Sequence, residues 1–166
     1  MSDWFFKLGE PLGVTAKRQV GEYLTGLGLI ETFPVESVSD WKSAHAAIAD
    51  ERWDPRWWEA EQREQDRLMK RVREGVGELG LMRALAASLG SADATYEAAT
   101  FEAARSGCSD AALIRAAAGA LSQALYLADL TRLAGMGVSH PFSVKKALFS
   151  GGHWPLGIVQ GTYYVF

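Results

Sequence analysis

The chain has 166 residues, 48% of them hydrophobic and 22% charged, and its formal net charge is −3. This length and composition are typical of one globular domain with a packed core, so we expect residues 1–166 to form a single domain. The acidic balance disfavours nucleic acid as a partner, because proteins that bind it normally present a basic surface. No apolar run reaches the roughly 18 residues that a membrane span needs, and the first residues lack the pattern of a signal peptide. We therefore expect a cytoplasmic protein that binds neither nucleic acid nor a membrane.

The first third of the chain predicts two short helices. Apolar side chains spaced three or four apart indicate a helix over residues 15–26. Residues 28–38 contain Pro34 among β-branched and aromatic side chains, which predicts a loop or at most a short extended piece. The capping signal Ser37–Asp40 then predicts a second helix over residues 39–50.

A third and longer helix begins after Asp54-Pro55, an N-cap aspartate followed by a proline, and runs toward Leu89. Intervals of three or four over about seven turns predict an apolar face made mostly of aliphatic side chains. This face comprises Trp58, Gln65, Leu68, Met69, Val72, Val76, Leu79, Met82 and Leu85. Gly75, Gly77 and Gly80 each cost roughly 1 kcal/mol relative to alanine inside a helix, so we expect a kink or a break there.

The segment Ser109–Leu133 predicts the central helix of the fold, after a fourth helix over residues 93–105. Ala116–Ala128 carries no charge and is apolar on nearly every helical face, which is typical of a buried helix. Small side chains recur at every fourth position and let a neighbouring helix pack closely: Ala116, Ala120, Ala124 and Ala128. Ser109 can be the N-cap and Gly135 can end the helix, so we expect a buried central helix over about residues 109–134.

The C-terminal residues change character after a short helix that begins at Ser139 or His140. The last residues are rich in β-branched and aromatic side chains, and Gln160-Gly161 can form the tight turn of a hairpin. The predicted fold is therefore mostly α: a single-domain bundle of five to seven helices around the central helix, with a short C-terminal β-hairpin or extended tail.

Tryptophan and arginine, the residue types that dominate binding hot spots, cluster around the start of the third helix. Trp53, Arg56, Trp57 and Trp58 predict a contact surface for another protein or for a second copy of this chain. The same tryptophans can instead cover the core, and the surrounding charges at spacings of four are typical of a solvated helix face.

The tail supplies three further candidates for that contact. Trp154 lies in a bend fixed by the following proline, and Tyr163 and Tyr164 lie in a strand that needs support because an isolated hairpin is marginal in water. Trp154 can also close the core, so the tail has a structural interpretation as well.

A small-molecule site is the alternative, because helical bundles form such sites between facing helices from aromatic and polar side chains. The candidates for this ligand-binding site are His45, Tyr96, Glu97, Gln123, Tyr126 and His153.

No catalytic constellation is visible in the sequence. The chain has no Glu-x-x-His pair and three scattered histidines, so we predict no metal site and no cofactor. Cys108 precedes the central helix, whose dipole favours a thiolate, but no histidine that could activate it lies nearby in sequence. We expect a non-catalytic protein that acts through protein–protein binding or self-association; the alternative is a small-molecule-binding bundle, which could be an enzyme.

Overall fold

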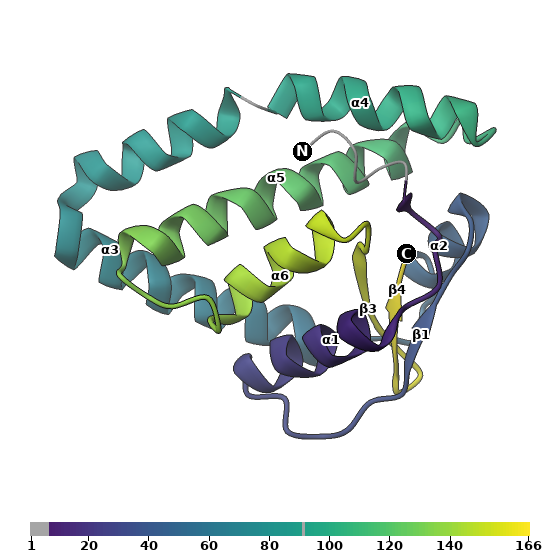
Figure 1. The fold of residues 1–166 in the computed structure, drawn as a ribbon, viewed down its shortest axis with the longest axis horizontal. Helices are drawn as coiled ribbons and strands as arrows, with labels where there is room; N and C mark the ends of the chain where they lie inside the picture. The colour runs from purple at the N-terminus through teal and green to yellow at the C-terminus, as the bar shows by residue number, and fades with distance from the viewer. Residues whose placement is uncertain (1–6, 91) are drawn as a thin grey trace.

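The computed structural model describes residues 7–90 and 92–166 and confirms the predicted fold class. In the described residues six helices pack together with a small four-stranded sheet (Figure 1). The helices are α1 (Val14–Gly26), α2 (Trp41–Ile48), α3 (Arg56–Leu89), α4 (Ala92–Arg105), α5 (Ala111–Leu133) and α6 (Pro141–Ser150). The strands are β1 (Val35–Ser37), β2 (Trp53–Asp54), β3 (Pro155–Val159) and β4 (Thr162–Val165).

Helix α5 is the element on which α3, α4 and α6 all pack. Its C-terminal half is largely enclosed, and Ala124 and Ala128 of the small-residue stripe are buried there. In its N-terminal half one face, with Ala112 and Ala116, is exposed to solvent. The helix is therefore central to the fold, and its neighbours cover the second half more completely than the first.

The N-cap of α5 is Asp110 rather than the predicted Ser109. The Asp110 carboxylate accepts the backbone N–H groups of Ala112 and Leu113, both at 3.0 Å. An aspartate in this position satisfies two orphan donors and places its charge at the positive end of the helix dipole.

By length and composition alone, α5 could cross a membrane. The expectation that no segment is long enough was wrong for this helix, because it counted only the uncharged run between Arg115 and Asp129. Of the most apolar stretch of α5, 44% is buried inside the fold. The core helix of a globular protein has the same length and composition, so this feature by itself does not indicate a membrane protein.

Helix α3 contains the predicted break, at Gly77, whose φ of 73° and ψ of 176° are not helical. The break shifts the helical phase. Leu68 and Val72 before it are buried, and after it Leu81 is the residue that is buried in the same cluster. The apolar face predicted from sequence therefore does not continue through the glycines, and its last members are exposed.

The sheet has the strand order β1-β4-β3-β2. Strands β3 and β4 form the predicted hairpin, with positive φ at Gln160 (50°) and Gly161 (78°), as a type I′ turn requires. Strand β4 also pairs in parallel with β1, which brings Val35 opposite Tyr163. Residues 28–38, predicted as a loop or short extended piece, thus supply an edge strand.

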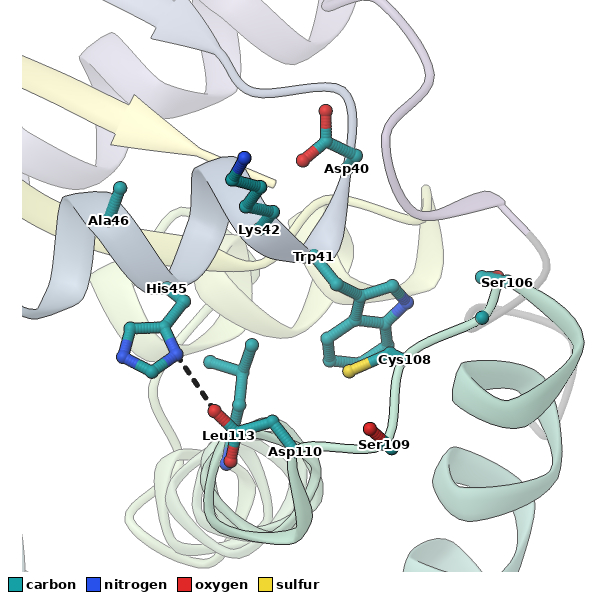
Figure 2. A pocket seen from close by; sticks show the side chains of 11 residues that line it. Asp40, Trp41, Lys42, His45, Ala46, Ser106, Cys108, Ser109, Asp110 and Leu113 are labelled. Atoms are coloured by element: carbon teal, nitrogen blue, oxygen red, sulfur yellow. Dashed lines mark hydrogen bonds and ion pairs between the residues drawn. The ribbon is translucent and has the colours of Figure 1, made fainter.

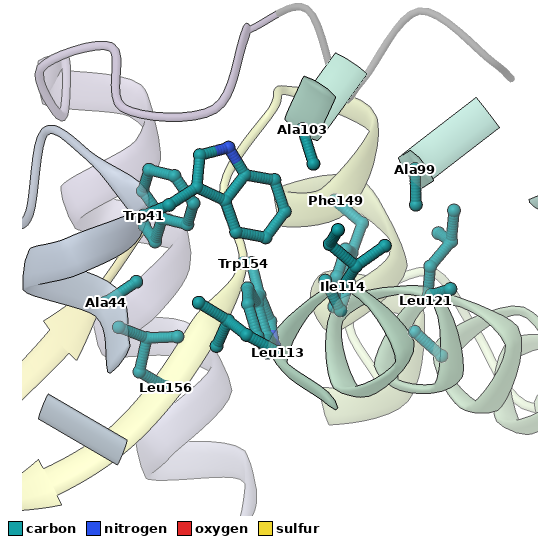
Figure 3. Packing of buried hydrophobic residues seen from close by; sticks show 14 residues of the cluster. Trp41, Ala44, Ala99, Ala103, Leu113, Ile114, Leu121, Phe149, Trp154 and Leu156 are labelled. Atoms are coloured by element: carbon teal, nitrogen blue, oxygen red, sulfur yellow. The ribbon is translucent and has the colours of Figure 1, made fainter. Parts of the chain in front are cut away.

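The tail closes the hydrophobic cluster between α2, α4 and α5 (Figure 3). Two tryptophans contact the ring of the last residue, Phe166: its centroid lies 5.1 Å from that of Trp41 and 6.4 Å from that of Trp154. The aromatic tail is thus part of the core.

Glycine is required at one position of β3. Gly157 has a φ of 128°, and a Cβ atom there would lie 2.9 Å from Trp53 Nε1 and 3.2 Å from the Trp57 ring. The absence of a side chain lets both indoles pack over the strand, which fixes β2 and the start of α3 against the sheet.

Candidate functional site

A row of aliphatic side chains faces solvent on the outer half of α3, the part that follows Gly77. Leu79, Met82 and Leu85 expose 64%, 54% and 37% of their surface; we call these three residues the outer row. In the same segment, Leu81 is buried and Ala84 packs against the cluster shared with α5. The outer half of α3 is therefore apolar over a broad face, and the fold covers only part of it.

The ribbon shows where the outer half of α3 lies. Helix α3 bends at the edge of the molecule and its outer half then runs toward α4 (Figure 1). Single exposed apolar residues are common, but aliphatic side chains grouped on one helical segment are typical of contact sites. The sequence placed these residues in the core, since it gave no means of seeing the phase shift at Gly77.

The three tryptophans near the start of α3 have different surroundings. Trp57 lies in the core, packed edge-on against Tyr163 with ring centroids 5.8 Å apart. Trp53 and Trp58 expose 37% and 50% of their surface. Of these three tryptophans, Trp53 and Trp58 are therefore the ones accessible to a partner.

Arg56, the fourth residue predicted for that surface, is exposed but engaged. Its guanidinium binds the carboxylates of Asp54 at 2.7 Å and Glu31 at 3.0 Å. The hydrogen bonds from Arg56 lower the pKa of Asp54. A partner that used Arg56 would compete with these two acids, which makes the residue a poor anchor.

The predicted contact residues of the tail are mostly internal. Trp154 and Tyr163 are buried, and Tyr164 is half-buried. Strand β4 has a neighbour on each side, so its backbone presents no free edge to a partner. The sequence could not reveal this, because the pairing of β4 with β1 joins segments far apart in the chain.

The six residues of the alternative ligand site do not converge. No pocket found among the described residues holds more than one of them. His45 lines two pockets between α2 and α5, Tyr96 lines one between α4 and α5, and the pocket between α5 and α6 holds none. Glu97 is exposed, Gln123 and Tyr126 are half-buried, and His153 is buried. The residues therefore do not form the shared site that the alternative predicted.

The pocket between α2 and the α4–α5 connection has a volume of about 560 Å³ and a mixed polar and apolar lining (Figure 2). His45 Nδ1 lies 2.8 Å from Asp110 Oδ2 at its wall. The N-cap hydrogen bond from Leu113 and the contact with His45 lower the pKa of Asp110. The His45–Asp110 pair thus ties α2 to the first turn of α5.

Cys108 lines the same pocket and is half-buried. Figure 2 shows its sulfur beneath the Trp41 ring, whereas His45 lies across the pocket with one ring nitrogen bonded to Asp110. A cysteine nucleophile needs a base within hydrogen-bond reach. Cys108, His45 and Asp110 line one pocket, which the sequence could not reveal, but they are not arranged as a catalytic triad.

A buried charged cluster lies where α1, α3, α6 and β4 meet, and the sequence analysis missed it. Lys145 Nζ lies 2.5 Å from Glu61 Oε1, and the two residues are only 3% and 4% exposed. The Tyr23 hydroxyl donates to the same carboxylate oxygen, and Trp57 Nε1–H donates to the Tyr23 hydroxyl at 2.9 Å. Tyr163 completes the cluster, and among the described residues its hydroxyl makes no hydrogen bond of good geometry.

The cluster alters the acidity of its two tyrosines. Burial, and then the nearby Glu61 carboxylate, raise the pKa of Tyr23 well above its usual value. The same two causes raise the pKa of Tyr163. Perturbed groups of this kind are enriched at active sites, but they also occur in structural ion-pair networks. The dense packing of the cluster favours the structural role.

A second polar contact lies one turn further along α3. His140 Nε2 lies 3.2 Å from Glu64 Oε1, and the backbone N–H of Phe142 donates to His140 Nδ1 at 3.3 Å. His140 is therefore the N-cap of α6, with its proton on Nε2. Burial lowers the pKa of His140, and Glu64 partly opposes that effect.

Within the described residues, no group of three or more histidine, cysteine or acidic side chains lies close enough together to hold a metal ion. The chain matches no known protein family, and no curated protein or solved structure is significantly similar to it. The candidate sites therefore depend on the geometry of this chain alone.

Proposed function

We propose that this protein works by binding another protein chain through the outer row of α3. The observation that carries the proposal is the exposure of Leu79, Met82 and Leu85 on a segment whose Leu81 is buried in the cluster shared with α5. Burying a leucine or methionine side chain is worth about 1.5–3 kcal/mol relative to leaving it in water, so three adjacent side chains can supply a useful part of a binding energy.

The experiment compares the wild type with a variant carrying Leu79→Gln, Met82→Gln and Leu85→Gln, which keeps three good helix formers in place. The control is Val138→Gln, which removes an apolar side chain that is even more exposed, at 90%, and lies outside the row. We expect the wild type and the control to retain a protein partner in affinity capture from native cells, and the variant to lose it. That partner must then bind again when both proteins are purified. An identical set of retained proteins for all three forms contradicts the proposal.

A second candidate function is small-molecule binding in the α2–α5 pocket, favoured by its volume of about 560 Å³ and the fixed His45–Asp110 pair. Ligand sites of this size commonly combine an aromatic wall, here Trp41, with a few polar groups. A fragment screen by NMR tests it. Binding at the pocket would move the Trp41 indole signal in the wild type and much less in Asp110→Asn. If no fragment moves this signal, small-molecule binding in this pocket is excluded.

A further inference from the structure

We propose that His140 is an acid-sensitive switch, in which a second proton on its ring releases the first turn of α6. The inference goes beyond the proposed function and does not depend on it. It is carried by the three groups around the His140 ring, which come from three helices: Glu64 of α3, Thr131 of α5 and Phe142 of α6.

The neutral ring caps α6. Pro141 has no N–H, so Phe142 is the first residue of this helix whose backbone can donate a hydrogen bond. Its N–H donates to His140 Nδ1 at 3.3 Å and makes no other hydrogen bond among the described residues. Phe142 is completely buried, so water does not replace this acceptor when it is lost.

The single proton of the neutral ring lies on the other nitrogen. Nε2 lies 3.2 Å from Glu64 Oε1, and a carboxylate only accepts, so Nε2 carries the hydrogen. The Thr131 hydroxyl donates to the Leu127 carbonyl at 2.8 Å, which leaves its oxygen with lone pairs only. This oxygen lies 3.4 Å from His140 Nδ1, so in the neutral state two acceptors face each other.

A second proton reverses the preference of Nδ1. Both ring nitrogens of a charged histidine are donors. The new Nδ1–H faces an acceptor in Thr131 Oγ1 and another donor in the Phe142 N–H, so the first contact becomes a hydrogen bond and the cap of α6 is lost. Burial lowers the pKa of His140 and Glu64 opposes that effect, so the proton binds in mild acid with the carboxylate as its counter-charge.

The charges around the ring leave Glu64 as its partner. The carboxylate of Glu64 is held from its other oxygen by Arg67 at 2.7 Å. The last turn of α1, which packs on α6, is uncharged. The other charges on the adjoining turns of α5 and α6 are Asp129 and Arg132, which pair with each other, Lys145, which binds Glu61, and Lys146.

The release of the first turn of α6 affects more than this helix. Phe142 belongs to the hydrophobic cluster that also holds Leu130 of α5 and Leu81 of the outer half of α3. Loss of the cap therefore loosens a cluster that supports the segment of α3 carrying the outer row.

The test is one pH titration of the whole protein by NMR with two readouts. The ¹⁵N shifts of the His140 ring give its midpoint, and hydrogen exchange of the Phe142 amide, corrected for the intrinsic effect of pH, gives its protection. Protection of Phe142 should be roughly tenfold lower one pH unit below the midpoint than one unit above it, as expected for a lost N-cap. The Ser43 amide, capped in α2 by Asp40 at 2.7 Å, is the matched control and should keep its protection.

Two variants separate a switch from a merely structural cap. His140→Asn keeps an acceptor for the Phe142 N–H and cannot titrate, so protection of Phe142 should be the same at both pH values. Thr131→Val removes the acceptor of the charged ring and should lower the His140 midpoint by about one pH unit.

Four results overturn the inference. Phe142 could keep its protection while His140 titrates, or lose it over the same pH range in His140→Asn. The midpoint of His140 could stay in place in Thr131→Val. The protein could also unfold before His140 binds its second proton.

Discussion

Glu61 and Lys145 form an ion pair in the interior of the protein, with Oε1 and Nζ 2.5 Å apart, and so connect the first half of α3 to α6. Two charges removed from water lose much of their solvation, and their attraction roughly compensates for it. The pair therefore fixes which helices pack together more than it adds to the free energy of unfolding.

Removing one partner of this pair should be more harmful than removing both charges. Lys145→Met leaves the Glu61 carboxylate buried without its cation and should lower the free energy of unfolding by about 3–5 kcal/mol. Adding Glu61→Gln keeps an acceptor for the Tyr23 hydroxyl and removes the charge, so the double variant should recover part of the loss. Urea denaturation measures both. A double variant less stable than Lys145→Met would contradict this account of the cluster.

Tyr163→Phe should cost little stability or increase it. The hydroxyl of Tyr163 is buried close to the Tyr23 hydroxyl and makes no hydrogen bond of good geometry among the described residues. Its removal therefore abolishes a poorly satisfied polar group while the ring contact with Trp57 is kept. We expect a change of the unfolding free energy of less than about 1 kcal/mol in the unfavourable direction. Tyr23→Phe is the matched comparison and should be clearly destabilising, because Glu61 and Trp57 both lose a hydrogen-bond partner.

The two buried tyrosines should limit stability in alkali. Because their folded pKa values are raised above the unfolded value near 10, their contribution is present below pH 10 and is lost as the pH rises above it. Absorbance at 295 nm should show Tyr23 and Tyr163 ionising together with unfolding. Early ionisation of both, with the circular dichroism signal intact, would show that they are not enclosed.

His140 should make the protein less stable in mild acid. Burial lowers the pKa of His140 in the folded protein. Below the unfolded value of about 6.5 the unfolded chain therefore binds the extra proton, and the free energy of unfolding decreases as the pH decreases. The slope from one histidine is at most about 1.4 kcal/mol per pH unit. His140→Asn keeps a capping side chain without the titration and should flatten the slope. His153, whose pKa burial also lowers, should account for what remains.

Gly157→Ala should destabilise the protein by about 1–3 kcal/mol, because its φ of 128° is strained for alanine and the added carbon would meet both Trp53 and Trp57. Gly21→Ala in α1 is the matched control, since a Cβ there meets nothing and alanine favours the helix. Thermal unfolding should give opposite signs for the two variants. Equal shifts would mean that the close approach at Gly157 is unimportant.

Helix positions were predictable because apolar periodicity and caps are local signals. The break at Gly77 and the turn at Gln160-Gly161 were predicted from glycine alone. The burial of individual side chains was harder to predict from sequence. Val72 and Met82 belong to the same predicted apolar face, but the break at Gly77 shifts the helical phase between them. Val72 is therefore buried and Met82 is exposed to solvent.

The buried charges could not be predicted for a related reason. Glu61 lies in a stretch of alternating acids and bases that reads as a solvated helix face, and its partner Lys145 is far away in the chain. Only tertiary packing brings them together. The pairing of His45 with Asp110 escaped the sequence analysis in the same way.

Oxidative footprinting of Met82 tests the central claim most directly, because it reports whether a protein chain covers the outer row. The account predicts that Met82 is protected in concentrated protein or in the native extract and becomes reactive on dilution, while the half-buried Met136 reacts at an unchanged rate. Oxidation of Met82 at one rate under all of these conditions would show that nothing covers the outer row and would contradict the account.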